Sequence, residues 1–124
     1  MITEDYISFE TAKLLKEKGF DEATFYDYNE RGTRWFEEVL VNHNSQGGVA
    51  CPTIQMAMKW LREAYNLEIY PYHNNSTIYN SKWWFEIIEY PNSVAEYESN
   101  IDEEYDTYEE ACEAAIEYCL DNLI

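Results

Sequence analysis

The C-terminal part of the chain carries a row of carboxylates at helical spacing. At 3.6 residues per turn, Glu109, Glu113, Glu117 and Asp121 fall on one side of a single helix. No Lys or Arg follows Lys82, although thirteen acidic residues do. Like charges four residues apart destabilise a helix by roughly 0.2–0.5 kcal/mol per pair, so the row costs about 1 kcal/mol. Such a row can hold a cationic partner, or it can serve only to hydrate the surface.

We predict that this acidic part of the chain is a docking surface for a basic protein. The prediction rests on the whole stretch from residue 83 onward, because it contains no compensating cation. Two alternatives stay open, namely a DNA mimic that occupies a nucleic-acid-binding host protein, and a solvated face without a partner. The candidate partner-binding residues are Glu103, Glu104, Glu109, Glu113, Glu117 and Asp121.

Cys51 is the residue best placed for nucleophilic chemistry. It precedes the expected N-terminus of a helix, a position that lowers the pKa of a thiol. A cysteine nucleophile also needs a neighbouring base, yet His43 and His73 fall in polar segments and no known nucleophile motif surrounds the cysteine. The same three residues lack the clustered spacing of a zinc site. We therefore predict no catalytic, metal-binding or cofactor-binding residues, and an enzyme using Cys51 remains the last alternative.

Composition limits the classes of partner. The chain has 124 residues, of which 46% are hydrophobic, and its formal net charge is −17. This length and apolar content predict one folded domain, residues 1–124. A polyanion disfavours direct binding to nucleic acid or to an anionic membrane, since both need basic residues. Three cysteines without a CxxC pair, together with the absence of an apolar leader or membrane-spanning run, predict a cytoplasmic protein with free thiols.

Three predicted helices must position the candidate residues. The first begins after Ser8 as its N-cap and stops at Gly19. Thr53 or Cys51 caps the second, and the third covers residues 107–123 with Thr107 as its cap. The apolar stripe of the second helix consists of Ala57, Trp60, Leu61, Ala64 and Tyr65.

A hairpin and a loop are predicted between the first two helices. Thr24–Tyr28 and Arg34–Val41 are rich in β-forming residues and flank the turn residues 29–33. Alternation is imperfect on the second strand, where Glu37 shares a face with apolar residues. Residues 43–53, with two adjacent glycines, are typical of a loop.

Two more strands and a connector are predicted before the last helix. Residues 67–72 are predicted to form a strand, and Pro71, which has no amide hydrogen to donate, favours an edge strand or the end of a strand. Residues 82–90 carry bulky side chains on both faces, which predicts a central strand covered on both sides. Residues 91–106 are predicted to be a polar acidic connector.

The resulting element order, α-ββ-α-ββ-α, predicts the α+β class. We expect a single domain in which a mainly antiparallel four-stranded sheet packs with three helices. The four tryptophans, Trp35, Trp60, Trp83 and Trp84, are expected in the core rather than in a ligand cage. Some of the twelve tyrosines must stay exposed, because one small core cannot hold them all. An exposed aromatic patch would favour protein binding or self-association.

Three blocks of the chain resemble a family of small acidic proteins encoded in Bacteroidales genomes and their phages and mobile elements. The blocks are "SFETAKLLKEKGF", "CPTIQMAMKWLREAYNLEI" and "YDTYEEACEAAIEYCLDNLI", which together cover roughly half of the chain. The resemblance implies an intracellular accessory protein of phage or mobile-element type, and it brings no catalytic residue with it. The sequence therefore predicts a noncatalytic interaction protein with an acidic C-terminal docking surface, no cofactor, and self-association as a further option.

Overall fold

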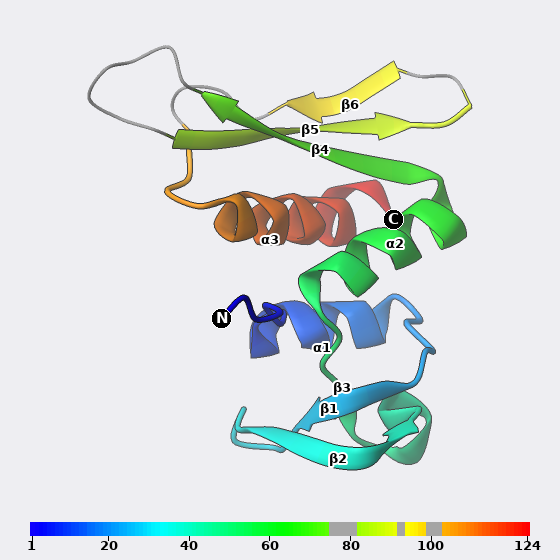
Figure 1. The fold of residues 1–124 in the computed structure, drawn as a ribbon. Helices are drawn as coiled ribbons and strands as arrows, with labels where there is room; N and C mark the ends of the chain where they lie inside the picture. Colours follow the sequence, from blue (N-terminus) through cyan, green and yellow to red (C-terminus); the bar gives the residue numbers. More distant parts are fainter. Residues whose placement is uncertain (75–81, 92–93, 99–102) are drawn as a thin grey trace.

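The computed structural model places the helices as a layer between two small sheets (Figure 1). It describes residues 1–74, 82–91, 94–98 and 103–124. The chain is a single α+β domain with three helices and two antiparallel three-stranded sheets. The predicted class is therefore confirmed. Within the described ranges, no helix combines the length and the apolar character needed to cross a membrane.

The three helices begin at the predicted caps. In α1 (Phe9–Glu17) the Ser8 side chain accepts a hydrogen bond from the Thr11 amide, and Gly19 follows the helix in a left-handed conformation. Thr53 caps α2 (Ile54–Tyr65), and Thr107 caps α3 (Tyr108–Tyr118) in the same way. The last helix continues into a π-helical turn, η3 (Cys119–Leu123).

The first sheet has the strand order β2-β1-β3. Its strands are β1 (Thr24–Tyr28), β2 (Arg34–Val41) and β3 (Val49–Ala50). The predicted hairpin is confirmed. The predicted loop is wrong, because it contains β3 and a 3-10 turn, η1 (His43–Gln46). The turn lets the chain reverse, and β3 pairs with the edge of β1 that β2 leaves open.

The second sheet has the strand order β4-β5-β6, with strands β4 (Leu67–Asn74), β5 (Lys82–Glu89) and β6 (Val94–Glu98). The central position of β5 and the edge position of the strand that contains Pro71 are confirmed. The prediction of a connector over residues 91–106 is wrong, since β6 lies within it and Tyr105 forms a bridge with Trp83. The acidic composition of this segment gave no indication of a strand. In the structure, β6 provides hydrogen-bond partners for the edge of β5 that β4 leaves open.

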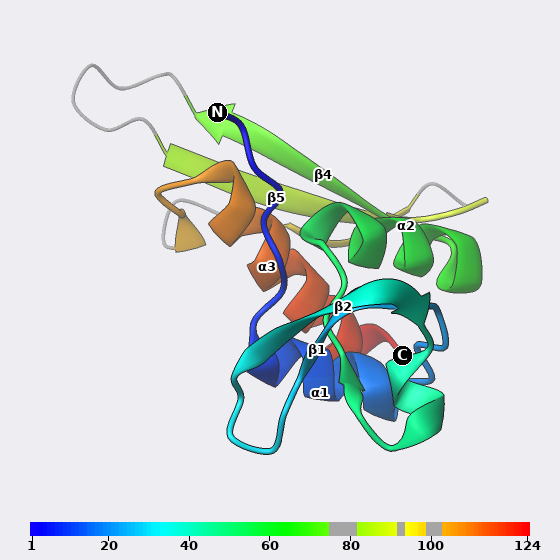
Figure 2. The same ribbon diagram turned by 60° about the horizontal axis from the view of Figure 1, so that its bottom comes forward.

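The prediction of one four-stranded sheet is also wrong. The strands belong to two sheets because the helices lie between the hairpin of the first sheet and the strands of the second (Figures 1 and 2). Each sheet therefore presents one face to the helices. On β5 the inward side chains Phe85 and Ile87 are buried, while Trp84 and Ile88 on the opposite face are only partly buried. Cover on both faces of β5 was expected, but among the described residues Trp84 and Ile88 are not fully covered.

The core lies between the three helices and the inner faces of the two sheets. Leu61, Ala115 and Cys119 are fully buried, as expected from the apolar faces of the two helices. Trp60 is only partly buried and packs edge-on against Phe20. The prediction that Trp35 lies in the core is wrong, because its side chain is 58% exposed. Trp83 and Trp84 are partly buried, and Tyr72 and Tyr90 are among the exposed tyrosines.

Leu61→Ala tests this core directly. Leu61 is completely buried in α2, so its truncation should lower the free energy of unfolding by about 2–5 kcal/mol if the site cannot collapse. The matched control is Lys59→Ala in the same helix, which is exposed and should change stability by no more than about 0.5 kcal/mol. Urea denaturation measures both. An unchanged midpoint for Leu61→Ala would show that this face of α2 is not in the core.

Candidate functional site

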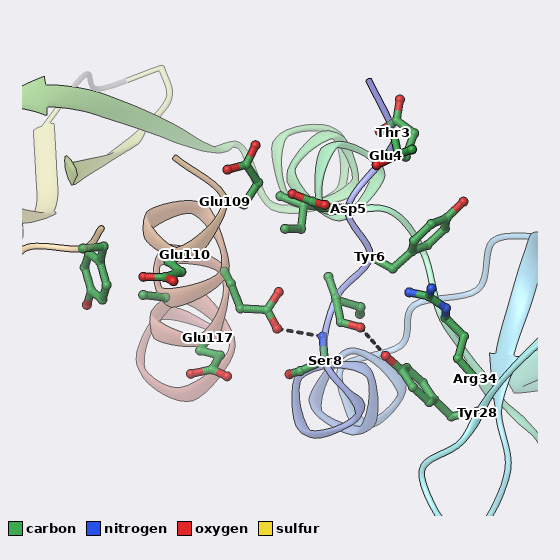
Figure 3. Close-up of a pocket in the computed structure, with 15 residues that line it drawn as sticks. Thr3, Glu4, Asp5, Tyr6, Ser8, Tyr28, Arg34, Glu109, Glu110 and Glu117 are labelled. Carbon is green, nitrogen blue, oxygen red and sulfur yellow. Dashed lines mark hydrogen bonds between the residues drawn. The ribbon is translucent and has the colours of Figure 1, made fainter. Parts of the chain in front are cut away.

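A cleft of about 770 Å³ opens between the N-terminal segment and α3 (Figure 3). We call it the α1–α3 cleft, because its wall runs from the N-terminal segment and Ser8, the N-cap of α1, to residues of α3. The hairpin of the first sheet closes one end with Tyr28 and Arg34. The lining residues are Thr3, Glu4, Asp5, Tyr6, Ile7, Ser8, Tyr28, Arg34, Ile54, Tyr105, Glu109, Glu110, Glu113, Ala114 and Glu117.

Two members of the carboxylate row accept hydrogen bonds from the N-terminal end of α1. A carboxylate oxygen of Glu113 accepts a 2.8 Å hydrogen bond from the Ser8 amide, and Glu117 accepts a 2.9 Å bond from the Thr11 hydroxyl. Ser8 is the N-cap of α1, where the helix dipole is equivalent to roughly half a positive charge. The N-terminus of a second helix therefore supplies the positive charge that the sequence around these residues lacks.

The rest of the cleft wall is more strongly acidic. Among the described residues that line it, six are carboxylates and one, Arg34, is a cation. Glu4, Asp5 and Glu109 are exposed, so their charges face solvent in the cleft. The Arg34 guanidinium lies over an aromatic ring, with its carbon 4.5 Å from the ring centre of Tyr6. It forms no salt bridge with a carboxylate of the described residues that line the cleft. The cleft is therefore a region of negative potential.

The aromatic residues of the cleft are neutral donors at physiological pH. Burial raises the pKa of Tyr28 far above its usual range, and the Tyr28 hydroxyl donates to the Ile7 carbonyl. Burial is also the main cause that raises the pKa of Tyr105, with further contributions from the charges of Glu103 and Glu117. These phenols can contact a ligand or donate to it, but they do not act as bases.

The other predicted partner-binding residues lie outside the cleft. Glu103 accepts a hydrogen bond from the Tyr97 hydroxyl, and this bond is the main cause that raises the pKa of Tyr97 to about 12. Glu104 is partly buried and adds to the field at Lys82, whose pKa is raised chiefly by its hydrogen bond to Asp106. Asp121 is exposed on η3.

The structure thus brings part of the predicted row together with residues that sequence reasoning missed. Glu109, Glu113 and Glu117 line the cleft opposite Glu4 and Asp5. The acidic start of the chain is visible in the sequence, but nothing there indicates that it lies against the last helix.

Cys51 lies at a site that suppresses thiol chemistry. Its side chain is 1% exposed and its sulfur is 3.7 Å from the Ile7 carbonyl oxygen. Burial raises the pKa of this thiol to about 11, so the thiolate needed for attack is scarce at neutral pH. Burial likewise raises the pKa of Cys112 to about 11 and that of Cys119 to about 12.

The two histidines are engaged elsewhere. The Nε2 atom of His43 lies 3.1 Å from the Thr24 carbonyl oxygen, so this nitrogen must carry the proton. Its Nδ1 atom is 3.8 Å from a carboxylate oxygen of Asp27. His73 belongs to the other sheet and packs against Trp83, with ring centres 4.8 Å apart. Among the described residues, no group of three or more His, Cys, Asp or Glu side chains is arranged to hold a metal ion.

No protein-family model, curated protein or solved structure matches this chain. The candidate site is therefore interpreted from its own geometry.

Glu113→Ala tests the contact between α3 and the N-terminus of α1. The variant removes a charge-assisted hydrogen bond to Ser8, so the free energy of unfolding should fall by about 1–2 kcal/mol. Glu109→Ala is the control, since Glu109 is exposed on the same helix and its loss should cost no more than about 0.5 kcal/mol. Urea denaturation of both variants measures the difference. Equal effects would mean that the bond to Ser8 contributes nothing to stability.

Alkylation tests the state of Cys51. Because its thiol is buried and its pKa is raised to about 11, iodoacetamide should modify it slowly in the folded protein at pH 8 and rapidly in urea. Mass spectrometry of peptides identifies the modified cysteine. Fast and selective labelling of Cys51 at pH 6 in the native protein would reveal an activated thiolate and would contradict this assignment.

Proposed function

We propose that the protein is a noncatalytic interaction protein that binds a basic segment of a partner protein in the α1–α3 cleft. The observation that carries this proposal is the composition of the cleft wall. Six carboxylates from two distant parts of the chain converge there, against one cation. The phage or mobile-element origin and the cytoplasmic location belong to the same proposal and rest on the sequence alone.

The cleft has the features that a Lys or Arg side chain needs. Glu113 and Glu117 are held in place by α1, so binding does not have to order them. The second oxygen of Glu113 is buried and receives no hydrogen bond from the described residues, so part of its charge remains uncompensated. Tyr6 and Tyr105 offer ring surface to the aliphatic stem or the charged head of the entering side chain.

The net charge favours capture of a basic partner over long range. A chain with a formal charge of −17 attracts a cationic segment before contact, which speeds association and makes it sensitive to salt. A DNA mimic would instead present its carboxylates outward on a convex surface. Here three members of the row line a concave wall, and α1 uses two of them. This arrangement favours a basic segment that enters the cleft.

A charge-matched pair of variants tests the proposal. The cleft variant combines Glu4→Gln, Asp5→Asn, Glu109→Gln and Glu110→Gln, and it spares the two carboxylates that hold α1. The control variant combines Glu22→Gln, Glu30→Gln, Glu63→Gln and Asp121→Asn, which are exposed and lie outside the cleft. Both lose the same formal charge. The probe is a synthetic peptide that alternates lysine and arginine with glycine, and calorimetry measures its affinity.

The cleft variant should bind the peptide at least about tenfold more weakly than the control variant, because only the cleft variant loses contacts made at short range. The affinity of the unmodified protein should fall as salt rises, since exposed charges are screened beyond roughly 8–10 Å. An equal loss in the two variants would mean that the peptide responds only to net charge, and the cleft would then not be a binding site.

A further inference from the structure

The second strand of the hairpin exposes an unusual amount of apolar surface. Among the described residues, Trp35, Phe36, Val39 and Leu40 of β2 are each 57–65% exposed, and Phe25 of the neighbouring strand is 44% exposed. The rings of Phe25 and Phe36 lie 6.1 Å apart, so these two side chains are neighbours. We call these five residues the hairpin patch. Contiguous apolar patches on a soluble protein are typical of contact surfaces.

The hairpin patch occupies both faces of its strand. Successive side chains of a strand point to opposite faces, so Trp35 lies on one face and Phe36 on the other. A flat partner that docked on the sheet would cover only one of these faces. A strand that extends the sheet from its edge brings side chains beside both faces at once. The distribution of exposure therefore favours pairing along the edge of β2.

The outer edge of β2 is open for such pairing. In the part of the chain that the structure describes, β1 is the only strand paired with β2. The Asn29 amide donates to the Thr33 carbonyl, so the alternation of an antiparallel ladder directs the backbone groups of Arg34 and Phe36 away from β1. The strand has no proline to block addition of a further strand.

A shift in strand pairing increases this exposure. Tyr26 faces Phe36 across the hairpin, whereas Thr24 faces Val41. Between these two pairs the chain advances by two residues in β1 and by five residues in β2. Val39 and Leu40 belong to the longer segment of β2, which has more residues than β1 can pair. A bulge in an edge strand usually blocks further pairing, but this one begins beyond Phe36 and leaves the segment from Arg34 to Phe36 in regular register with β1.

We infer that β2 pairs with β2 of a second copy of this chain, antiparallel and with Phe36 opposite Phe36. In this register Arg34 of each copy faces Glu38 of the other, which gives two cross-strand pairs of opposite charge around the two-fold axis. Centring the pair on Glu37 or on Glu38 would place two carboxylates opposite each other. Centring it on Trp35 would place Arg34 opposite Phe36. Charge complementarity selects the register that is centred on Phe36.

The present contacts of Arg34 are compatible with this pairing. Its guanidinium stacks over the rings of Tyr6 and Tyr26 at 4.5 and 5.0 Å. A guanidinium carries five N–H groups, so Arg34, which lies over these rings and hydrogen-bonds the Cys51 thiol, retains further donors for a carboxylate. The proposed pairing does not depend on the α1–α3 cleft being a binding site, although Arg34 also lines that cleft.

Sedimentation equilibrium of the full chain tests the inference. The measurement uses physiological salt, since two chains of charge −17 repel at low ionic strength. The mass should rise with concentration from 14.8 kDa towards twice that value. Phe36→Lys should abolish the rise, because it places two cations opposite each other at the symmetry axis. A chain that stays at 14.8 kDa at every concentration overturns the inference and leaves the edge to a different protein.

A charge exchange tests the register. Arg34→Glu alone and Glu38→Arg alone should each raise the Kd about tenfold, because each variant places like charges opposite each other twice. An equimolar mixture of the two variants should dimerise as the unmodified chain does, since each contact then joins opposite charges. This recovery also shows that both variants fold.

The matched control is the mixture of Arg34→Glu with Glu37→Arg. In the proposed register Glu37 faces Trp35, so the Glu37→Arg chains keep both Arg34–Glu38 pairs and should dimerise with one another, whereas the Arg34→Glu chains should not recover in this mixture. Recovery in both mixtures, or in neither while the unmodified chain still dimerises, would overturn the Phe36-centred pairing.

Discussion

The N-terminus of α1 rests on the carboxylates of α3, and the arrangement of the whole chain depends on this contact. Ser8 and Glu113 are separated by 105 positions in sequence, yet an amide of one donates to the carboxylate of the other. The second bond, from Thr11 to Glu117, lies one turn further along both helices. Together they bring the first and the last helix side by side and give the acidic helix the positive charge that it lacks. The stabilisation is electrostatic and local, since the dipole of a helix acts mainly within its first turn.

This contact leads to a layered fold with a sheet on each side. Because α1 and α3 lie against each other, the hairpin that follows α1 cannot join the strands that precede α3 (Figure 1). Each sheet therefore has one face on the helices and one face away from them. For a domain of this size the result is an unusually exposed β2, with large apolar residues on both of its faces. The apolar side chains of β2 are therefore not enclosed in the core, and this edge strand remains available for pairing with another chain.

The same carboxylates serve structure and, in our proposal, recognition. Glu113 and Glu117 hold α1 and also line the cleft, while Glu4, Asp5 and Glu109 add charge without such a structural duty. This division separates the two roles experimentally, because the exposed acids can be changed while the contact with α1 stays intact. The five apolar residues of the hairpin patch lie outside the cleft, on the hairpin of the first sheet. A basic partner and a second copy of the chain would thus respond in different ways to salt and to substitution.

The sequence by itself determined the local elements of this protein. Caps at Ser8, Thr53 and Thr107 and the turn of the hairpin were predictable, because they depend on neighbours within a few residues. The apolar face of α2 was predicted only in part, since Ala64 is exposed whereas Met58, which was not assigned to that face, is buried. The row formed by Glu109, Glu113 and Glu117 was predictable as a geometric fact of the helix. What lies opposite that row was decided only by the tertiary structure, which places Ser8, Glu4 and Asp5 there. Likewise β3 and β6 form because an open strand edge needs hydrogen-bond partners, and a short polar segment does not signal which edge it will meet. The exposure of Trp35 had the same cause: aromatic character predicts burial only where another layer covers the strand, and no described segment covers β2 on its outer side.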